Sequence, residues 1–124
     1  MTDYVILLPG NEATWEQTSP EDKAKMYAKH EEFARTLQTR GHKITGGAEL
    51  THSRNTKQVT RAGDGKVSIT DGPYAETVEQ LTGFYLVQSD DLDDLLQICG
   101  ILADAENVVE VRTTVDSTAR QDES

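Results

Sequence analysis

The sequence predicts a single α+β domain, and three of its features carry that prediction. Its 124 residues match the length of one domain around one hydrophobic core. Short apolar runs alternate with two longer segments whose apolar residues recur at helical spacing. Between the two halves, two short segments flank a glycine-containing turn, which is typical of a β-hairpin. The predicted order is strand, helix, strand, hairpin, strand, helix, strand.

The first half begins with an apolar strand at residues 4–8, which we expect to end in a turn at residues 9–10. A loop carrying Trp15 follows. Ser19 and Pro20 then predict the start of a helix, because serine caps free backbone N–H groups and proline fits the first helical position.

This first helix is expected to run to Arg40 and to stop at Gly41. Its apolar residues form one narrow stripe at about 100° per residue. The stripe consists of Met26, Phe33 and Leu37, with Tyr27 and Ala34 on one shoulder. His30 falls in the middle of the stripe, so a titratable ring is expected on the face that packs against the core.

The second strand is predicted at residues 43–50, where Gly46 and Gly47 interrupt it. Glycines inside a strand indicate a bulge or a close approach by a ligand or another backbone. The hairpin follows, with its strands at residues 58–61 and 66–70.

Asp71, Gly72 and Pro73 then predict a sharp corner, because proline fixes its own φ and restricts the residue before it. The chain returns from this corner to an apolar, aromatic-rich run at residues 83–87, which we expect to be a central strand. A loop anchored in this way to a rigid strand is a common place for functional residues.

A second helix is predicted to open at residues 89–91, followed by a last strand at residues 108–114. The apolar stripe of this helix is Leu92, Leu95, Leu96, Cys99 and Leu102. We therefore expect one domain over residues 1–115 and a polar, disordered tail over residues 116–124.

Together these elements form a ferredoxin-like split βαβ arrangement with an inserted β-hairpin. The expected antiparallel sheet carries two helices on one face. Its other face must also be covered, and a second copy of the sheet is the economical cover, so we expect a homodimer of the dimeric α/β-barrel type.

The charge of the chain argues against two classes of partner. The 12 Lys and Arg residues face 22 Asp and Glu residues, which gives a formal net charge of −10. Binding to nucleic acid or to an anionic membrane requires a basic patch that this composition does not favour. The single cysteine fits a reducing compartment, and the first residues lack the pattern of a signal segment. We expect a cytoplasmic protein.

The motifs of the chain resemble those of a known family, the DGPF-domain branch of the YCII-related proteins. The most specific part is TDGPYAET at residues 70–77, with EQLTGFYL at 79–86 and VEVR at 109–112. The resemblance covers nearly the whole chain up to about the last strand. It departs mildly from the family at Tyr74, where Phe is usual, and at Thr113, where Pro often follows the Arg.

The members of this family are small bacterial proteins of the dimeric ferredoxin-like, α/β-barrel type. The resemblance therefore implies a fold and a pocket more than a particular reaction. Most members have no established activity, and some are similar to, or encoded beside, sigma-factor systems. A hydrolytic dehalogenase of the wider family is thought to use a His-Asp pair. Of that pair only His30 is carried over to this chain, and pairing it with Asp71 is our own hypothesis.

His30 and Asp71 are the candidate catalytic residues. An imidazole within a core-facing stripe is either a core histidine with a polar partner or an acid or base that lines a pocket. Asp71 could orient that imidazole, as general acid–base chemistry requires, or it could simply cap its own turn. Both alternatives stay open for each residue at this point.

Five further residues are candidates for ligand binding: Tyr4, Trp15, Gly47, Tyr85 and Arg112. The aromatic residues could wall a pocket or simply fill the core. Arg112 shares a strand face with Glu110, so it could form an ion pair there or a fork for a carboxylate or phenolate ligand.

The sequence predicts neither a metal site nor a cofactor. His42 and His52 lack the spacing of metal ligands, and Gly46 and Gly47 lack the helix and lysine of a phosphate loop. Two functional hypotheses follow. The first is a small-molecule-binding or regulatory domain, and the second is a cofactor-free hydrolase or isomerase that acts on a small cyclic anionic compound.

Overall fold

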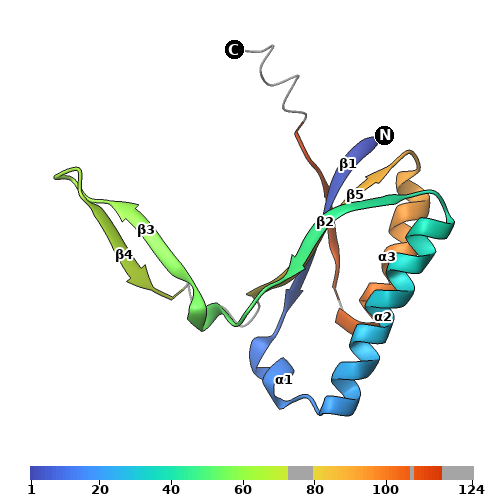
Figure 1. Cartoon of the computed structure of the whole chain (residues 1–124), viewed down its shortest axis with the longest axis horizontal. Coiled ribbons are helices and arrows are strands. Elements are labelled where there is room, and N and C mark those ends of the chain that lie inside the picture. The colour runs from blue at the N-terminus through green and yellow to red at the C-terminus, as the bar shows by residue number, and fades with distance from the viewer. Residues whose placement is uncertain (73–79, 107, 116–124) are drawn as a thin grey trace.

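The computed structural model describes residues 1–72, 80–106 and 108–115. Four strands form one sheet in the order β2-β5-β1-β6, and all neighbours are antiparallel. They are β1 (Thr2–Gly10), β2 (Lys43–Glu49), β5 (Gln80–Ser89) and β6 (Glu110–Thr113). Two helices, α2 (Pro20–Thr39) and α3 (Leu92–Glu106), lie together on one side of this sheet (Figure 1). The predicted α+β, ferredoxin-like arrangement is confirmed.

The hydrophobic core lies between the sheet and the two helices. Its buried members are Tyr4, Ile6, Leu8, Phe33, Leu37, Val87, Leu95, Ile98, Cys99 and Leu102. Alternation along β1 turns every second side chain toward the helices, while α2 and α3 each contribute one stripe. Leu92 and Leu96 of the predicted α3 stripe are instead exposed, and Ile98 takes a core position.

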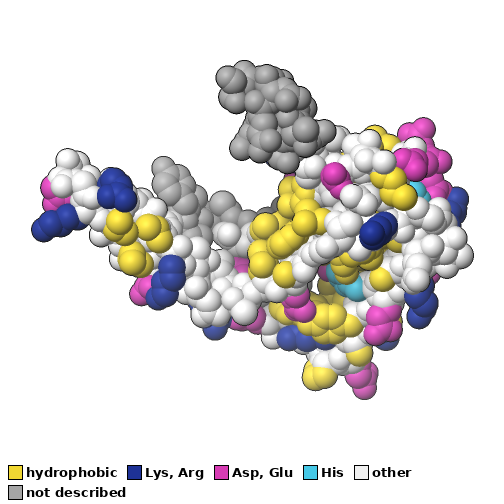
Figure 2. Space-filling model, turned by 45° about the horizontal axis from the view of Figure 1, so that its top comes forward, with side chains coloured by type: hydrophobic (Ala, Val, Ile, Leu, Met, Phe, Trp, Pro, Cys, Tyr) yellow, Lys and Arg dark blue, Asp and Glu magenta, His cyan; other side chains and the backbone are white. Residues whose placement is uncertain are grey.

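On the opposite face of the sheet, apolar side chains have no helix over them among the residues that the structure describes. Val5 pairs with Leu86 and Leu7 pairs with Phe84, and these four side chains alternate with residues of the core. Leu86 is exposed and the other three are half-buried. Figure 2 shows hydrophobic side chains gathered on the body, on the side toward the hairpin.

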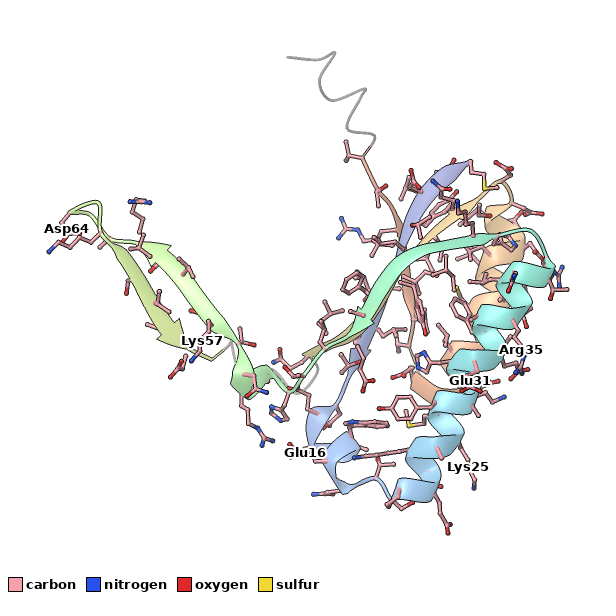
Figure 3. The ribbon with its side chains drawn as sticks, in the orientation of Figure 1. Glu16, Lys25, Glu31, Arg35, Lys57 and Asp64 are labelled. Atoms are coloured by element: carbon pink, nitrogen blue, oxygen red, sulfur yellow. The ribbon has the colours of Figure 1, made fainter. Side chains whose placement is uncertain are left out.

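The hairpin projects away from this body. Its strands, β3 (Lys57–Arg61) and β4 (Val67–Asp71), pair antiparallel and form a separate two-stranded sheet (Figure 1). A short 3₁₀ helix, η1 (Ser53–Asn55), precedes it. In Figure 3, Lys57 lies near the base of the hairpin and Asp64 lies at its far tip.

Two local predictions were wrong. Trp15 lies in a short helix, α1 (Glu12–Gln17), rather than in a loop, because Asn11 caps this helix by accepting from the Thr14 amide at 3.1 Å. Pro9 lies within β1 rather than in a turn. The pairing of β1 with β5 shifts register between Leu8 and Pro9, and such an irregularity accommodates a residue that cannot donate a ladder hydrogen bond.

Two of the glycines singled out in the sequence, Gly47 and Gly72, have positive φ angles. Gly47 adopts φ 144°, and a Cβ there would lie 2.5 Å from the Phe84 carbonyl oxygen, so the close approach is to another backbone. Gly72 adopts φ 93° at the predicted corner. The remainder of the corner, residues 73–79, and the predicted disordered tail lie outside the described residues.

Candidate functional site

A cavity of about 1010 Å³ opens where α1, α2, β2, β5 and the end of α3 meet. Aromatic and acidic side chains line much of it. The helices contribute Trp15, Lys23, Tyr27, His30 and Glu106, and the strands contribute Gly47, Glu49 and Tyr85, among others. This volume falls at the upper end of the range for small-molecule sites.

A chain of hydrogen bonds runs through one wall of the cavity. His30 Nδ1 lies 2.7 Å from the Tyr85 hydroxyl, and His30 Nε2 lies 2.9 Å from Glu106 Oε1. When Nε2 carries the hydrogen of a neutral imidazole, it donates to Glu106, and Nδ1 accepts from Tyr85. The carboxylate therefore orients the ring, and the ring contacts the phenol.

The two helices and the central strand bring these three residues together. His30 lies on the α2 stripe between Met26 and Phe33, and Glu106 lies one turn beyond Leu102 on the α3 stripe. Both stripes face the same side of the sheet, where Tyr85 projects from β5. The polar residue on each apolar stripe therefore lies within hydrogen-bonding distance of a partner on a neighbouring element.

Packing fixes the Tyr85 ring in this position. The ring lies 5.2 Å from that of buried Phe33 and stacks on His30 at 5.9 Å between centroids. Burial raises the pKa of the Tyr85 hydroxyl, and the negative charges of Glu106 and Glu49 raise it further. The phenol therefore stays protonated at neutral pH and can donate a hydrogen bond.

Another part of the cavity lining is aromatic. Trp15 and Tyr27 meet edge to face with their ring centroids 5.8 Å apart. Tyr27 donates to Glu49 Oε1 at 2.8 Å, and this hydrogen bond is the main cause of its raised pKa. The Lys23 ammonium lies 4.8 Å from the centre of the Trp15 ring, within the distance of a cation–π interaction.

Helix α1, which carries Trp15, is tied to the base of the hairpin. Glu12 accepts from the Ser53 amide at 2.6 Å and from its hydroxyl, and Glu16 pairs with Arg54. His52 Nδ1 lies 3.8 Å from Glu12 Oε2, and His52 Nε2 lies 3.5 Å from Glu16 Oε1. These hydrogen bonds with Ser53 and the charges of His52 and Arg54 outweigh desolvation, so the pKa of Glu12 is lowered. Figure 3 shows Glu16 beside α1, on the side toward the hairpin.

The cavity brings together four of the seven candidate residues from the sequence. His30, Trp15, Gly47 and Tyr85 line it. Tyr4 is buried in the core and is not among the lining residues. Arg112 pairs with Val5 on the uncovered face of the sheet, so a fork for an anionic ligand is not part of this cavity.

The structure does not bring Asp71 to His30. Asp71 ends β4 on the hairpin, is exposed, and forms an ion pair with Lys57. Both ring nitrogens of His30 already have partners, and Glu106 takes the carboxylate role. The hypothesis of a His30–Asp71 pair within one chain was wrong because Asp71 belongs to a ribbon that leaves the body.

Glu106 is the site residue that sequence reasoning missed. It continues the stripe of Cys99 and Leu102 at helical spacing, so it is a charged residue on a core-facing stripe, as unusual there as His30. Tyr27, Glu49 and Lys23 carried no comparable signal, because their roles depend on how α1 and β2 meet α2.

A second histidine serves the fold instead. His42 is buried, with Nδ1 2.8 Å from the Ser89 hydroxyl and Nε2 2.7 Å from Asp94 Oδ2. Asp94 also pairs with Arg40, so this network ties the end of α2 to the start of α3. Because its nitrogens are satisfied away from the cavity, we assign His42 a structural role.

The described residues contain no group of three or more His, Cys, Asp or Glu side chains arranged to hold a metal ion. Among the helices in the described part of the chain, none has both the length and the apolar character to cross a membrane.

Comparison with known proteins places the chain in a family. Over 61 residues it is 39% identical to the uncharacterized protein R00369 of Rhizobium meliloti (strain 1021), an alignment that spans 49% of this chain and 41% of that protein. The sequence pattern of the YCII-related domain matches residues 2–116. The chain therefore belongs to the YCII-related family.

Proposed function

We propose that this chain is a small-molecule-binding domain whose ligand occupies the cavity and contacts the Tyr85 hydroxyl. The observation that carries the proposal is the hydrogen-bonded chain from Glu106 through His30 to Tyr85, which lines a cavity large enough for an organic molecule. Because both nitrogens of His30 are already bonded, the Tyr85 hydroxyl is the member of the chain best placed to contact a ligand.

A fragment screen with and without this hydroxyl tests the proposal. Compounds that raise the melting temperature of the wild type should lose that effect in Tyr85→Phe, which removes one oxygen and keeps the ring. Tyr4→Phe is the matched control, since Tyr4 lies in the core and not in the cavity. Equal weakening by both substitutions, or no binding compound at all, would contradict the proposal.

The same geometry favours acid–base catalysis as a second function. As a base, the Tyr85 oxygen would accept a proton from the ligand while the phenolic proton passes to His30 Nδ1. Glu106 would stabilise the imidazolium that forms. Such a relay suits hydrolysis or isomerisation without a cofactor. In His30→Gln, conversion of a bound compound, followed by NMR, should stop while the compound still binds.

We also propose that the chain forms a homodimer through the uncovered face of its sheet. Val5, Leu7, Phe84 and Leu86 form an apolar surface that no helix covers among the described residues. A second copy would bury this surface over roughly 1,200–2,000 Å² or more. Sedimentation should show a dimer at micromolar concentration and a monomer for Leu86→Glu, and a monomeric wild type would refute the interface.

Three further predictions are also proposals. The family resemblance supports membership of the DGPF branch and a regulatory role linked to sigma-factor systems, and the single cysteine and the first residues support a cytoplasmic location. The free Cys99, which is buried in the core, is consistent with a reducing compartment.

A further inference from the structure

The charged side chains around the cavity are unequal in sign. Among the described residues that line it, four are glutamates and only Lys23 is a lysine or arginine. The four are Glu12, Glu16, Glu49 and Glu106. Two of them already have cationic or amide partners at the base of the hairpin, where Arg54 pairs with Glu16 and Ser53 donates to Glu12. Glu49 and Glu106 are different, because their contacts are with a phenol and an imidazole.

These two carboxylates make the electrostatic potential around Tyr27 and Tyr85 more negative. The hydrogen bond to Glu49 raises the pKa of Tyr27, and burial raises the pKa of Tyr85; the negative charges of Glu49 and Glu106 raise both pKa values further. A field that disfavours a phenolate on two walls disfavours any anionic guest between them. The same field attracts a cation.

One cation already occupies part of this environment. The Lys23 ammonium, from the first turns of α2, lies over the face of Trp15 at 4.8 Å from the ring centre. The face of an indole ring is the most favourable aromatic surface for a positive charge. Trp15 in turn meets Tyr27 edge to face, and Tyr27 donates to Glu49, so an aromatic wall and a carboxylate lie next to each other.

We propose that the cavity selects a small organic cation, an amine or quaternary ammonium compound with an apolar body. Its charged group lies near Glu49 and the Trp15–Tyr27 wall, while the Tyr85 hydroxyl contacts its polar substituent. The inference rests on the proposed ligand-binding function and names the class of ligand. It replaces the anionic compound expected from the sequence, because Arg112, the residue expected to bind it, lies on the other face of the sheet.

Trp15 makes the proposal directly measurable, because it is the single tryptophan of the chain and lies in the cavity wall. Its fluorescence can be titrated with three probes of similar size: benzyltrimethylammonium, benzyl alcohol and benzoate. At pH 7 the cation should change the emission at a concentration about tenfold lower than the neutral alcohol requires. Benzoate should be the weakest of the three.

A matched pair of variants locates the effect. Glu49→Gln removes one charge from the cavity and keeps the shape, so it should weaken benzyltrimethylammonium several-fold and leave benzyl alcohol unchanged. Glu31→Gln removes the same charge from an exposed position of α2 that does not line the cavity (Figure 3). It should leave all three affinities unchanged.

The outcomes separate two kinds of failure. If the alcohol binds as tightly as the cation, or benzoate binds best, the cavity binds ligands but the proposed selectivity for cations is wrong. Equal weakening by Glu49→Gln and Glu31→Gln would also overturn it, because the preference would then reflect net charge alone. If none of the three probes changes the emission of Trp15, both the selectivity and ligand binding in this cavity are refuted.

Discussion

The body of the molecule and the β3–β4 hairpin differ in how far they bury their apolar side chains. In the body, Ile6, Phe33 and Leu37 are fully buried between sheet and helices. In the hairpin, Val59, Val67 and Ile69 are 66%, 53% and 66% exposed, on the face that also carries Lys57 and Asp71. An isolated two-stranded hairpin is at best marginally stable in water. The comparison teaches that the body buries its own apolar residues, whereas the hairpin leaves its apolar residues exposed, and we propose that a second copy covers them.

Charge distinguishes the two regions as well. Residues 57–71 contain three basic and two acidic side chains, whereas the whole chain has 12 against 22. Figure 2 shows the hydrophobic side chains of the hairpin between charged groups of both signs. The proposed homodimer would bring this slightly basic ribbon near an acidic body, which favours association. The uncovered sheet and the exposed ribbon then have one common explanation.

The largest expected difference between the regions is in the free energy of unfolding. Phe33→Ala should lower it by about 3–5 kcal/mol, because it opens a cavity beneath Tyr85. Ile69→Ala removes an exposed side chain and should change it by less than about 0.5 kcal/mol in the dilute protein. Urea denaturation measures both. Similar losses for the two variants would show that the hairpin is packed as tightly as the core.

Substitution of one glycine in the body and one in the hairpin compares the backbone constraints of the two regions. Gly47→Ala should cost about 2–3 kcal/mol, because its positive φ and the Phe84 carbonyl oxygen leave no place for a Cβ. Gly65→Ala, in the hairpin turn at φ 84° with open space around it, should cost about 1 kcal/mol from its backbone conformation alone. Urea denaturation midpoints provide the measurement. An equal cost would mean that β2 moves away from β5 to admit the methyl group.

How far the sequence predicts each region follows from the range of the interactions. The helix start at Ser19 was predicted because its cause is local: the Ser19 hydroxyl accepts from the Asp22 amide at 3.1 Å. The hairpin strands were predicted for a similar reason, since the glycine-containing turn lies between them. His30 was singled out because a polar residue on an apolar stripe is visible in the sequence.

The partner of His30 could not be predicted in this way. Glu106 lies 76 residues from His30 along the chain, and their contact depends on the packing of α3 beside α2. Asp71 attracted the prediction because it lies in the most distinctive motif, yet the hairpin carries it away from the body. Helix α1 was missed because a six-residue helix contains too few residues to show a period.

Burial in the body should also appear as a dependence of stability on pH. Burial raises the pKa of the Cys99 thiol from 9.0 to about 11. The unfolded chain therefore loses this proton first, so stability is complete below pH 9 and falls as pH rises to about 11. The loss should be on the order of 2 kcal/mol. Cys99→Ala should remove that part of the pH dependence, and an unchanged profile would show that the thiol contributes nothing to it.

The smallest expected effect is the free energy of opening the hairpin, and hydrogen exchange of its amides compares it directly with that of the body. In dilute protein, amides paired between β3 and β4 should open at a cost of about 1–2 kcal/mol, far below those between β1 and β5. If a second copy covers the ribbon, their protection should rise with protein concentration, whereas that of the β1–β5 pair should not. Leu86→Glu, which is designed to separate the copies, should remove this concentration dependence.

Protection that is high at every concentration would show that the ribbon is stable by itself. Protection that stays low at every concentration, while the wild type sediments as a dimer, would place the hairpin outside the interface.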